Sequence, residues 1–175
     1  MAEQNTQVEE MAKEGTQKVE AVAQPVEMTE NDKYLNTGSH IGTKFKSGDM
    51  KKYIYKMRKD GLFVLDVETI DKRLKAAAAL LVSIPGNKIA VVARRAYAQV
   101  PAKAFSESVG ARSFVGRFIP GTFTNSQNTR FFEPKAVIVT DPETDSQAIE
   151  EATRVRVPVI ALVSTNNSLD RKSVV

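Results

Sequence analysis

Uninterrupted runs of apolar residues alternate with amphipathic segments along most of the chain. The apolar runs predict strands, and the amphipathic segments predict helices. The predicted strands are residues 62–66, 88–93, 113–115, 136–140 and 158–163, and the predicted helices are residues 69–84, 97–109 and 145–155. Because the strand runs do not alternate with polar residues, we expect both faces of the sheet to be covered. The pattern predicts an α/β fold, an open and mainly parallel sheet with helices on both faces and functional loops at the carboxyl ends of its strands.

Turn and capping residues mark the ends of these helices. Pro85 and Gly86 stop the first helix, and Gly110 terminates the second. Pro101 lies near the start of the second helix or kinks it. Asp145 is expected to cap the third helix, because aspartate is a favoured residue at that position.

Charge divides the chain into two parts. Residues 1–32 contain eight acids, two bases and no aromatic residue, which predicts a disordered acidic tail. Residues 33–175 contain 23 bases and 13 acids and are expected to form a single α/β domain. A body with this excess of cations suits a polyanion such as nucleic acid, although on charge alone a solubilising surface explains it equally well.

The segment 44–59 combines cations with aromatic residues. It reads KFKSGDMKKYIYKMRK and contains one acid, Asp49. Its candidate RNA-binding residues are Lys44, Lys46, Lys51, Lys52, Tyr53, Lys56, Arg58 and Lys59. Cations neutralise phosphates and aromatic rings stack on unpaired bases, so this composition favours RNA binding. The alternative is a solvated segment in which Tyr53, Ile54 and Met57 pack on the core.

Two further groups of candidates follow predicted strands. Arg94 and Arg95 come directly after the strand 88–93, at the end where α/β sheets place ligand contacts. Their guanidinium groups suit phosphate oxygens, although a pair of surface arginines explains them equally well. The long polar and aromatic loop 116–134 holds the other candidates, namely Arg117, Thr124, Asn125 and Arg130. Its length favours a functional role over an ordinary surface loop.

Residues that carry common catalytic chemistry are scarce. The sequence has no cysteine and a single histidine, His40, which excludes disulfides, thiolate nucleophiles and the usual zinc sites. We interpret His40 as a structural residue with satisfied hydrogen bonds. Asp66 and Asp141 follow strands, where a magnesium site is conceivable, but capping and turn formation explain them more simply. No phosphate-loop motif is found and no apolar run has the length of a membrane span. We therefore expect no enzyme activity, metal, cofactor, small-molecule substrate or membrane contact.

Several segments carry a resemblance to a known family. They are Gly38–Lys44, Met50–Tyr55, Arg58–Asp66, Gly116–Asn125, Val139–Pro142 and Val157–Asn166. In this order, from about Tyr34 to Asp170, the chain resembles the small-subunit ribosomal proteins of the universal second family, in their compact archaeal-type form. The coiled-coil insertion of bacterial members is absent, since few residues separate Asn125 from Phe131. Relative to the family, the sequence after Asp170 looks shortened by a strand and a helix.

The resemblance implies a flavodoxin-like α/β domain that binds ribosomal RNA and contacts neighbouring ribosomal proteins in the small subunit. It also implies a role in subunit assembly and translation in the cytoplasm, without catalysis. Two other functions stay open: a nucleotide- or phosphate-binding α/β enzyme that uses the strand-end loops, and a protein–protein adaptor that works through the acidic tail.

Overall fold

The computed structural model describes residues 30–168, and side chains from Tyr34 onward. The chain divides into two units between Asn36 and Thr37. Helix α2 (Glu30–Thr37) contains the described end of the first unit. Most of the predicted acidic tail, and the sequence after Ser168, therefore lie outside the described residues.

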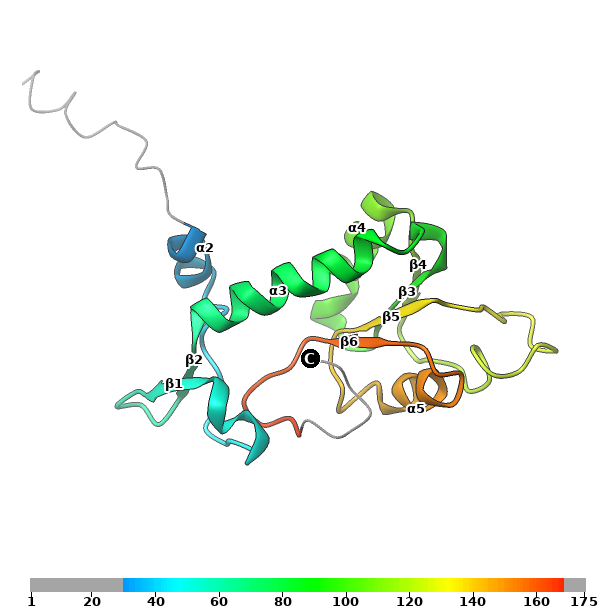
Figure 1. Cartoon of the computed structure of the whole chain (residues 1–175). Coiled ribbons are helices and arrows are strands. Elements are labelled where there is room, and N and C mark those ends of the chain that lie inside the picture. The colour runs from blue at the N-terminus through cyan, green and yellow to red at the C-terminus, as the bar shows by residue number, and fades with distance from the viewer. Residues whose placement is uncertain (1–29, 169–175) are drawn as a thin grey trace, which may run out of the picture. The chain divides into compact units, whose positions relative to one another are not determined.

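A four-stranded parallel sheet organises the second unit, as predicted (Figure 1). Its strands are β4 (Arg112–Val115), β3 (Ile89–Ala93), β5 (Ala136–Val139) and β6 (Val159–Ala161), in that spatial order. The chain passes from β3 to its neighbour β4 on one side, and from β5 to β6 on the other side. The carboxyl ends of β3 and β5 therefore form the switch point at which α/β sheets place ligand sites.

Both faces of this sheet are covered. Successive residues of a strand point to opposite faces, so the buried strand residues divide between two core clusters. Ile89, Val91 and Ala93 of β3 pack in one core cluster with Ala102 of helix α4 (Ala96–Val109). The other cluster, on the opposite face, contains Ala90 and Val92 of β3 and the apolar side of helix α5 (Ser146–Arg154). The prediction of a sheet buried on both faces is confirmed.

The helices begin and end close to the predicted residues. Helix α3 (Val67–Val82) starts after Asp66, whose carboxylate accepts a hydrogen bond from Glu68 N at 3.3 Å. Gly110 ends α4 in the left-handed conformation, with φ of 73°, which glycine adopts without steric cost. Pro101 lies inside α4, near its start.

The predicted strand 62–66 does not join the parallel sheet. It forms β2 (Phe63–Leu65), which pairs antiparallel with β1 (Ile54–Met57) in a separate two-stranded sheet. A short 3-10 helix (Asp49–Tyr53) precedes β1, and Gly61, with φ of 76°, lies in the turn between the strands. The sequence did not reveal β1, because most of its side chains are exposed and its pattern is dominated by the cations around it.

Candidate nucleic-acid interface

The basic segment (residues 44–59) lies largely on the surface of the second unit. All of its lysines and Arg58 are exposed. Arg58 forms an exposed ion pair with Asp60 at 3.9 Å, whereas no described acid pairs with any of the lysines. Three lysine ammonium groups lie over aromatic rings, at 5.1 Å for Lys46, 5.0 Å for Lys52 and 5.6 Å for Lys56 from the ring centres. The positive charge of this segment is therefore presented to solvent.

A few side chains of the segment pack inward, as the alternative interpretation required. Met50, which the sequence analysis did not single out, is 2% exposed. Tyr53 and Ile54 are half-buried, and the Tyr53 hydroxyl accepts a hydrogen bond from the Arg73 guanidinium at 3.4 Å. Met57 is 62% exposed and does not pack on the core. The segment is thus both anchored and cationic.

Polar contacts with the loop that follows β6 hold the start of the segment. Thr43 N donates to Thr165 Oγ1 at 2.9 Å, and Ser47 N donates to Thr165 O at 2.9 Å. The Ser47 hydroxyl donates to Asn167 O at 2.7 Å. Gly42 permits this close approach, since a Cβ at that position would lie 2.4 Å from Thr165 Cγ2. Residues 122 positions apart in the chain therefore fix the backbone that carries the cations.

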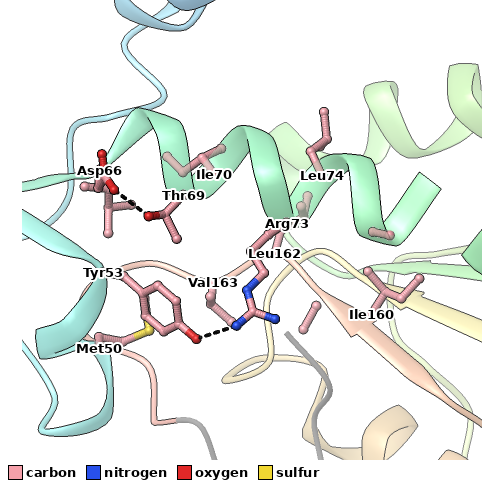
Figure 2. A pocket seen from close by; sticks show the side chains of 13 residues that line it. Met50, Tyr53, Asp66, Thr69, Ile70, Arg73, Leu74, Ile160, Leu162 and Val163 are labelled. Carbon is pink, nitrogen blue, oxygen red and sulfur yellow. Dashed lines mark hydrogen bonds between the residues drawn. The ribbon is translucent and has the colours of Figure 1, made fainter. Parts of the chain in front are cut away.

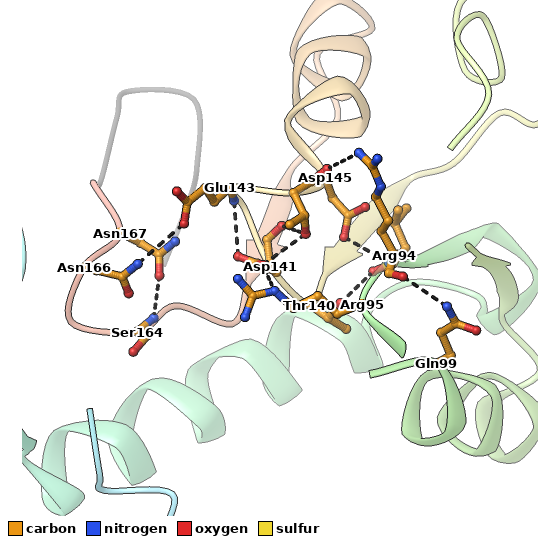
Figure 3. A network of polar contacts seen from close by, with 12 residues as sticks. Arg94, Arg95, Gln99, Thr140, Asp141, Glu143, Asp145, Ser164, Asn166 and Asn167 are labelled. Atoms are coloured by element: carbon orange, nitrogen blue, oxygen red, sulfur yellow. Dashed lines mark hydrogen bonds and ion pairs between the residues drawn. The ribbon is translucent and has the colours of Figure 1, made fainter. Parts of the chain in front are cut away.

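Arg94 and Arg95 lie at the switch point, where the sequence predicted them (Figure 3). Both have partners in the loop that follows β5. Arg95 forms an ion pair with Asp141, while the Arg94 guanidinium donates to Thr144 O at 3.4 Å. Arg94 N donates to the Asp145 carboxylate at 3.3 Å. In contrast to the lysines of the basic segment, these two arginines are already engaged within the protein.

Asp145 occupies the N-cap position of α5, as predicted, but its side chain makes no capping hydrogen bond. Its carboxylate instead accepts the hydrogen bond of Arg94 N, because the switch point brings the ends of β3 and α5 together. Burial raises the pKa of Asp145, the backbone N–H of Arg94 lowers it in part, and the nearby Asp141 carboxylate raises it further. Its second oxygen, Oδ1, is buried without a hydrogen-bond partner among the described residues.

Arg117 and Arg130 line one hollow of about 350 Å³ against β4. Lys103 of α4 and Arg112 of β4 complete its cationic lining. The sequence analysis missed these two cations, because only the packing of α4 beside β4 brings them to the loop. The hollow shares no lining residue with the shallow depression beside Lys51 in the basic segment. The cations of the basic segment and those of the hollow therefore line different depressions.

The loop after β4 (residues 116–135) leads from the carboxyl ends of the parallel strands back to their amino ends. Gly116 N donates to Ala93 O at 2.9 Å, at the carboxyl end of β3. Lys135 N donates to Lys88 O at 2.7 Å, just before the amino end of β3. Figure 1 shows the loop extending from the second unit at the end opposite to the hairpin of β1 and β2.

A buried carboxylate accepts hydrogen bonds from the backbone of this loop. Glu151 of α5 is 1% exposed. It accepts hydrogen bonds from Gly121 N at 2.6 Å, from Phe123 N at 3.0 Å and from the Gln147 side chain at 3.0 Å. The sequence analysis missed Glu151, although the apolar residues at positions 148 and 152 place it on the buried side of the helix.

Two asparagine side chains of the loop, one of them the candidate Asn125, bind its backbone. Thr124 and Asn125 are exposed. The Asn125 side chain accepts a hydrogen bond from Gln127 N at 3.0 Å, and the Asn128 side chain accepts one from Arg130 N at 3.0 Å. These Asx turns hold the backbone around Arg130 in a defined conformation.

An apolar groove of about 170 Å³ lies between α3 and β6 (Figure 2). Its apolar lining includes Ile70 and Leu74 of α3, Ile160 of β6 and Val163 of the loop that follows β6. The Asp66 carboxylate at its edge accepts a hydrogen bond from the Thr69 hydroxyl. This aspartate therefore acts as a helix-start residue, as the simpler interpretation of the sequence held.

The described residues include no group of three or more histidine, cysteine or acidic side chains placed to hold a metal ion. His40 is half-buried, and its ring nitrogen Nδ1 has no hydrogen-bond partner among residues 34–168. Among the described helices, none is both long and apolar enough to cross a bilayer.

The fold and these surfaces define a parallel α/β protein whose surface loops and sheet edge carry clusters of cations. Residues 34–132 and 128–173 match the family described as ribosomal protein S2. The chain belongs to this family, and so to the proteins of the small ribosomal subunit, a ribonucleoprotein of translation. The two matched stretches meet in the loop after β4. The resemblance seen in the sequence is confirmed, and the family is one of structural ribosomal proteins, typically without enzyme activity.

Proposed function

We propose that this chain binds ribosomal RNA through the basic segment 44–59 and thereby supports assembly of the small subunit and translation in the cytoplasm, without catalysing a reaction. Its further partners are neighbouring ribosomal proteins. One observation carries the proposal: exposed lysines, which have no acidic partner within residues 34–168, stand on a backbone that Thr165 and the buried Met50 hold in place.

The physical argument concerns the cost of binding. Each lysine that neutralises a phosphate releases counterions from the RNA, which makes association favourable at low salt. A segment that is already ordered loses less conformational freedom on binding than a free tail does. The hydrogen bonds of Thr43 and Ser47 with Thr165 supply this order at the start of the segment.

The test is a titration of the full chain with a small-subunit ribosomal RNA transcript at several salt concentrations. For the triple variant Lys51→Gln, Lys52→Gln, Lys56→Gln, we expect the slope of log K against log salt to fall by about 2, given about 0.7–0.9 per lost phosphate contact. A wild-type chain without affinity for this RNA at low salt would refute the proposal.

A matched control removes the same charge elsewhere. Lys72, Lys75 and Arg154 are exposed cations, each in an ion pair with an acid four residues away on its own helix. Their replacement by glutamine should leave the salt slope close to that of the wild type. Equal losses in the two triple variants would mean that net charge, and not the basic segment, determines binding.

A further inference from the structure

The hollow against β4 concentrates positive charge. Its cations come from four different places in the chain: Lys103 from α4, Arg112 from β4, Arg117 from the start of the following loop, and Arg130 from the end of that loop. No acidic residue lines the hollow, and no described acid forms an ion pair with any of the four. Like charges that converge on one hollow repel each other, so the arrangement gains stability when an anion enters.

Arg112 is fixed in an orientation that suits an anion. Its guanidinium lies 5.5 Å from the ring centre of Phe114 and 5.2 Å from that of Phe132. The two rings are themselves packed together, with centres 5.9 Å apart. A cation–π contact of this kind uses the charge of the guanidinium and occupies none of its N–H groups with an oxygen acceptor, so these donors stay available for a ligand.

Arg117 and Arg130 are also held on an ordered backbone. The loop that carries them is bound to α5 through Glu151, which accepts hydrogen bonds from Gly121 N and Phe123 N. The loop rings Phe118 and Phe123 are buried in the core and are not available to stack on bases. What the hollow offers a ligand is therefore charge and N–H donors, and not aromatic surface.

We propose that this hollow binds phosphate groups of the ribosomal RNA backbone, as a second contact separate from the basic segment. The inference rests on the proposed function, since it takes the same RNA as the ligand. Phosphate is favoured over a base because the rings near the hollow are covered by Arg112 or by the core. An acidic peptide is the competing ligand, and the experiment distinguishes it.

The test compares the triple variant Lys103→Gln, Arg117→Gln, Arg130→Gln with the control triple variant of Lys72, Lys75 and Arg154. Both are titrated as full chains with the small-subunit RNA transcript and with poly-glutamate, over a range of salt concentrations. We expect the salt slope for RNA to fall by about 2 in the hollow variant and to stay unchanged in the control. Equal slopes in both variants would overturn the proposal.

The remaining outcomes separate the possible causes. Loss of poly-glutamate binding with unchanged RNA binding would overturn the proposal in favour of an acidic peptide. The variant Arg117→Lys, Arg130→Lys keeps the charge and should keep the slope, because the slope reports the number of neutralised phosphates. A loss as large as that of the glutamine variant would overturn the proposal that the charge of the hollow binds phosphate. A reduced slope in the hollow variant, with none in the Lys51, Lys52 and Lys56 variant, supports the hollow and refutes the basic segment.

Discussion

Replacing Glu151 by alanine removes a carboxylate that is 1% exposed and accepts hydrogen bonds from Gly121 N, Phe123 N and the Gln147 side chain. The two backbone donors are then left without an acceptor inside the protein. An unsatisfied buried donor costs about 1–3 kcal/mol, so we expect a loss of about 2–6 kcal/mol in the free energy of unfolding. This is a large part of the 5–15 kcal/mol, roughly, that stabilises a typical domain.

Glutamine at position 151 should give a smaller loss. Its single carbonyl oxygen can accept one of the two backbone N–H groups, while its amide group faces the other donor. We expect about 1–3 kcal/mol for Glu151→Gln, close to the cost of one unsatisfied donor. The neighbouring Glu150 is the control, because its side chain is 48% exposed and forms an ion pair with Arg154 at 4.0 Å. An exposed pair of this kind contributes about 0–1 kcal/mol.

Urea unfolding followed by circular dichroism measures these differences. Hydrogen exchange gives a local readout, because the amides of Gly121 and Phe123 should lose protection in the Glu151→Ala variant. A result in which Glu151→Ala and Glu150→Ala unfold at the same urea concentration would refute the reasoning. Unchanged protection of both amides would show that some other acceptor holds the loop.

Three further predictions concern the other contacts of the second unit. Gly42→Ala should lower the free energy of unfolding by about 1–3 kcal/mol, because the new Cβ would overlap Thr165. Gly48→Ala is the control: a Cβ there meets nothing within 4 Å, so the free energy of unfolding in the same urea titration should stay equal or rise slightly. Thr165→Val should weaken RNA binding by the basic segment, since the hydroxyl that accepts a hydrogen bond from the backbone N–H of Thr43 is lost; unchanged affinity would contradict this. Burial raises the pKa of Asp145 in the folded chain, so the wild type loses stability as the pH rises through the interval between the ordinary and the raised pKa. The unfolding free energy of Asp145→Asn minus that of the wild type should therefore increase with pH across that interval, and a value that stays constant or falls with pH in urea titrations would refute the prediction.

The parallel sheet could be predicted because its strands are buried on both faces. Every residue of β3 is buried, which requires the continuous apolar run that the sequence displays. β1 could not be predicted, since its burial depends on a partner strand and most of its side chains are exposed. Strand 62–66 was recognised as a strand, but its pairing partner lies only a few residues upstream, which the apolar run by itself does not reveal.

The candidate site was predictable only where its residues are neighbours in sequence. The basic segment is one continuous stretch, so its cations are visible without a structure. Arg117 and Arg130 share a loop, and the loop closes on one hollow. Lys103 and Arg112 join that hollow through the packing of α4 beside β4, which no local pattern encodes. The engagement of Arg95 by Asp141 likewise follows from the neighbouring positions of β3 and β5.

The sequence by itself determined the strands of the parallel sheet, the helices between them, the excess of cations and the family, because these depend on local composition and on residues that follow one another along the chain. Only the tertiary structure decided which charged side chains are engaged and which face solvent. Glu150 and Glu151 are adjacent and chemically identical, yet one is half-exposed and the other is buried under a loop. The difference arises because burial and hydrogen bonding depend on what packs against a residue, and those partners come from distant parts of the chain.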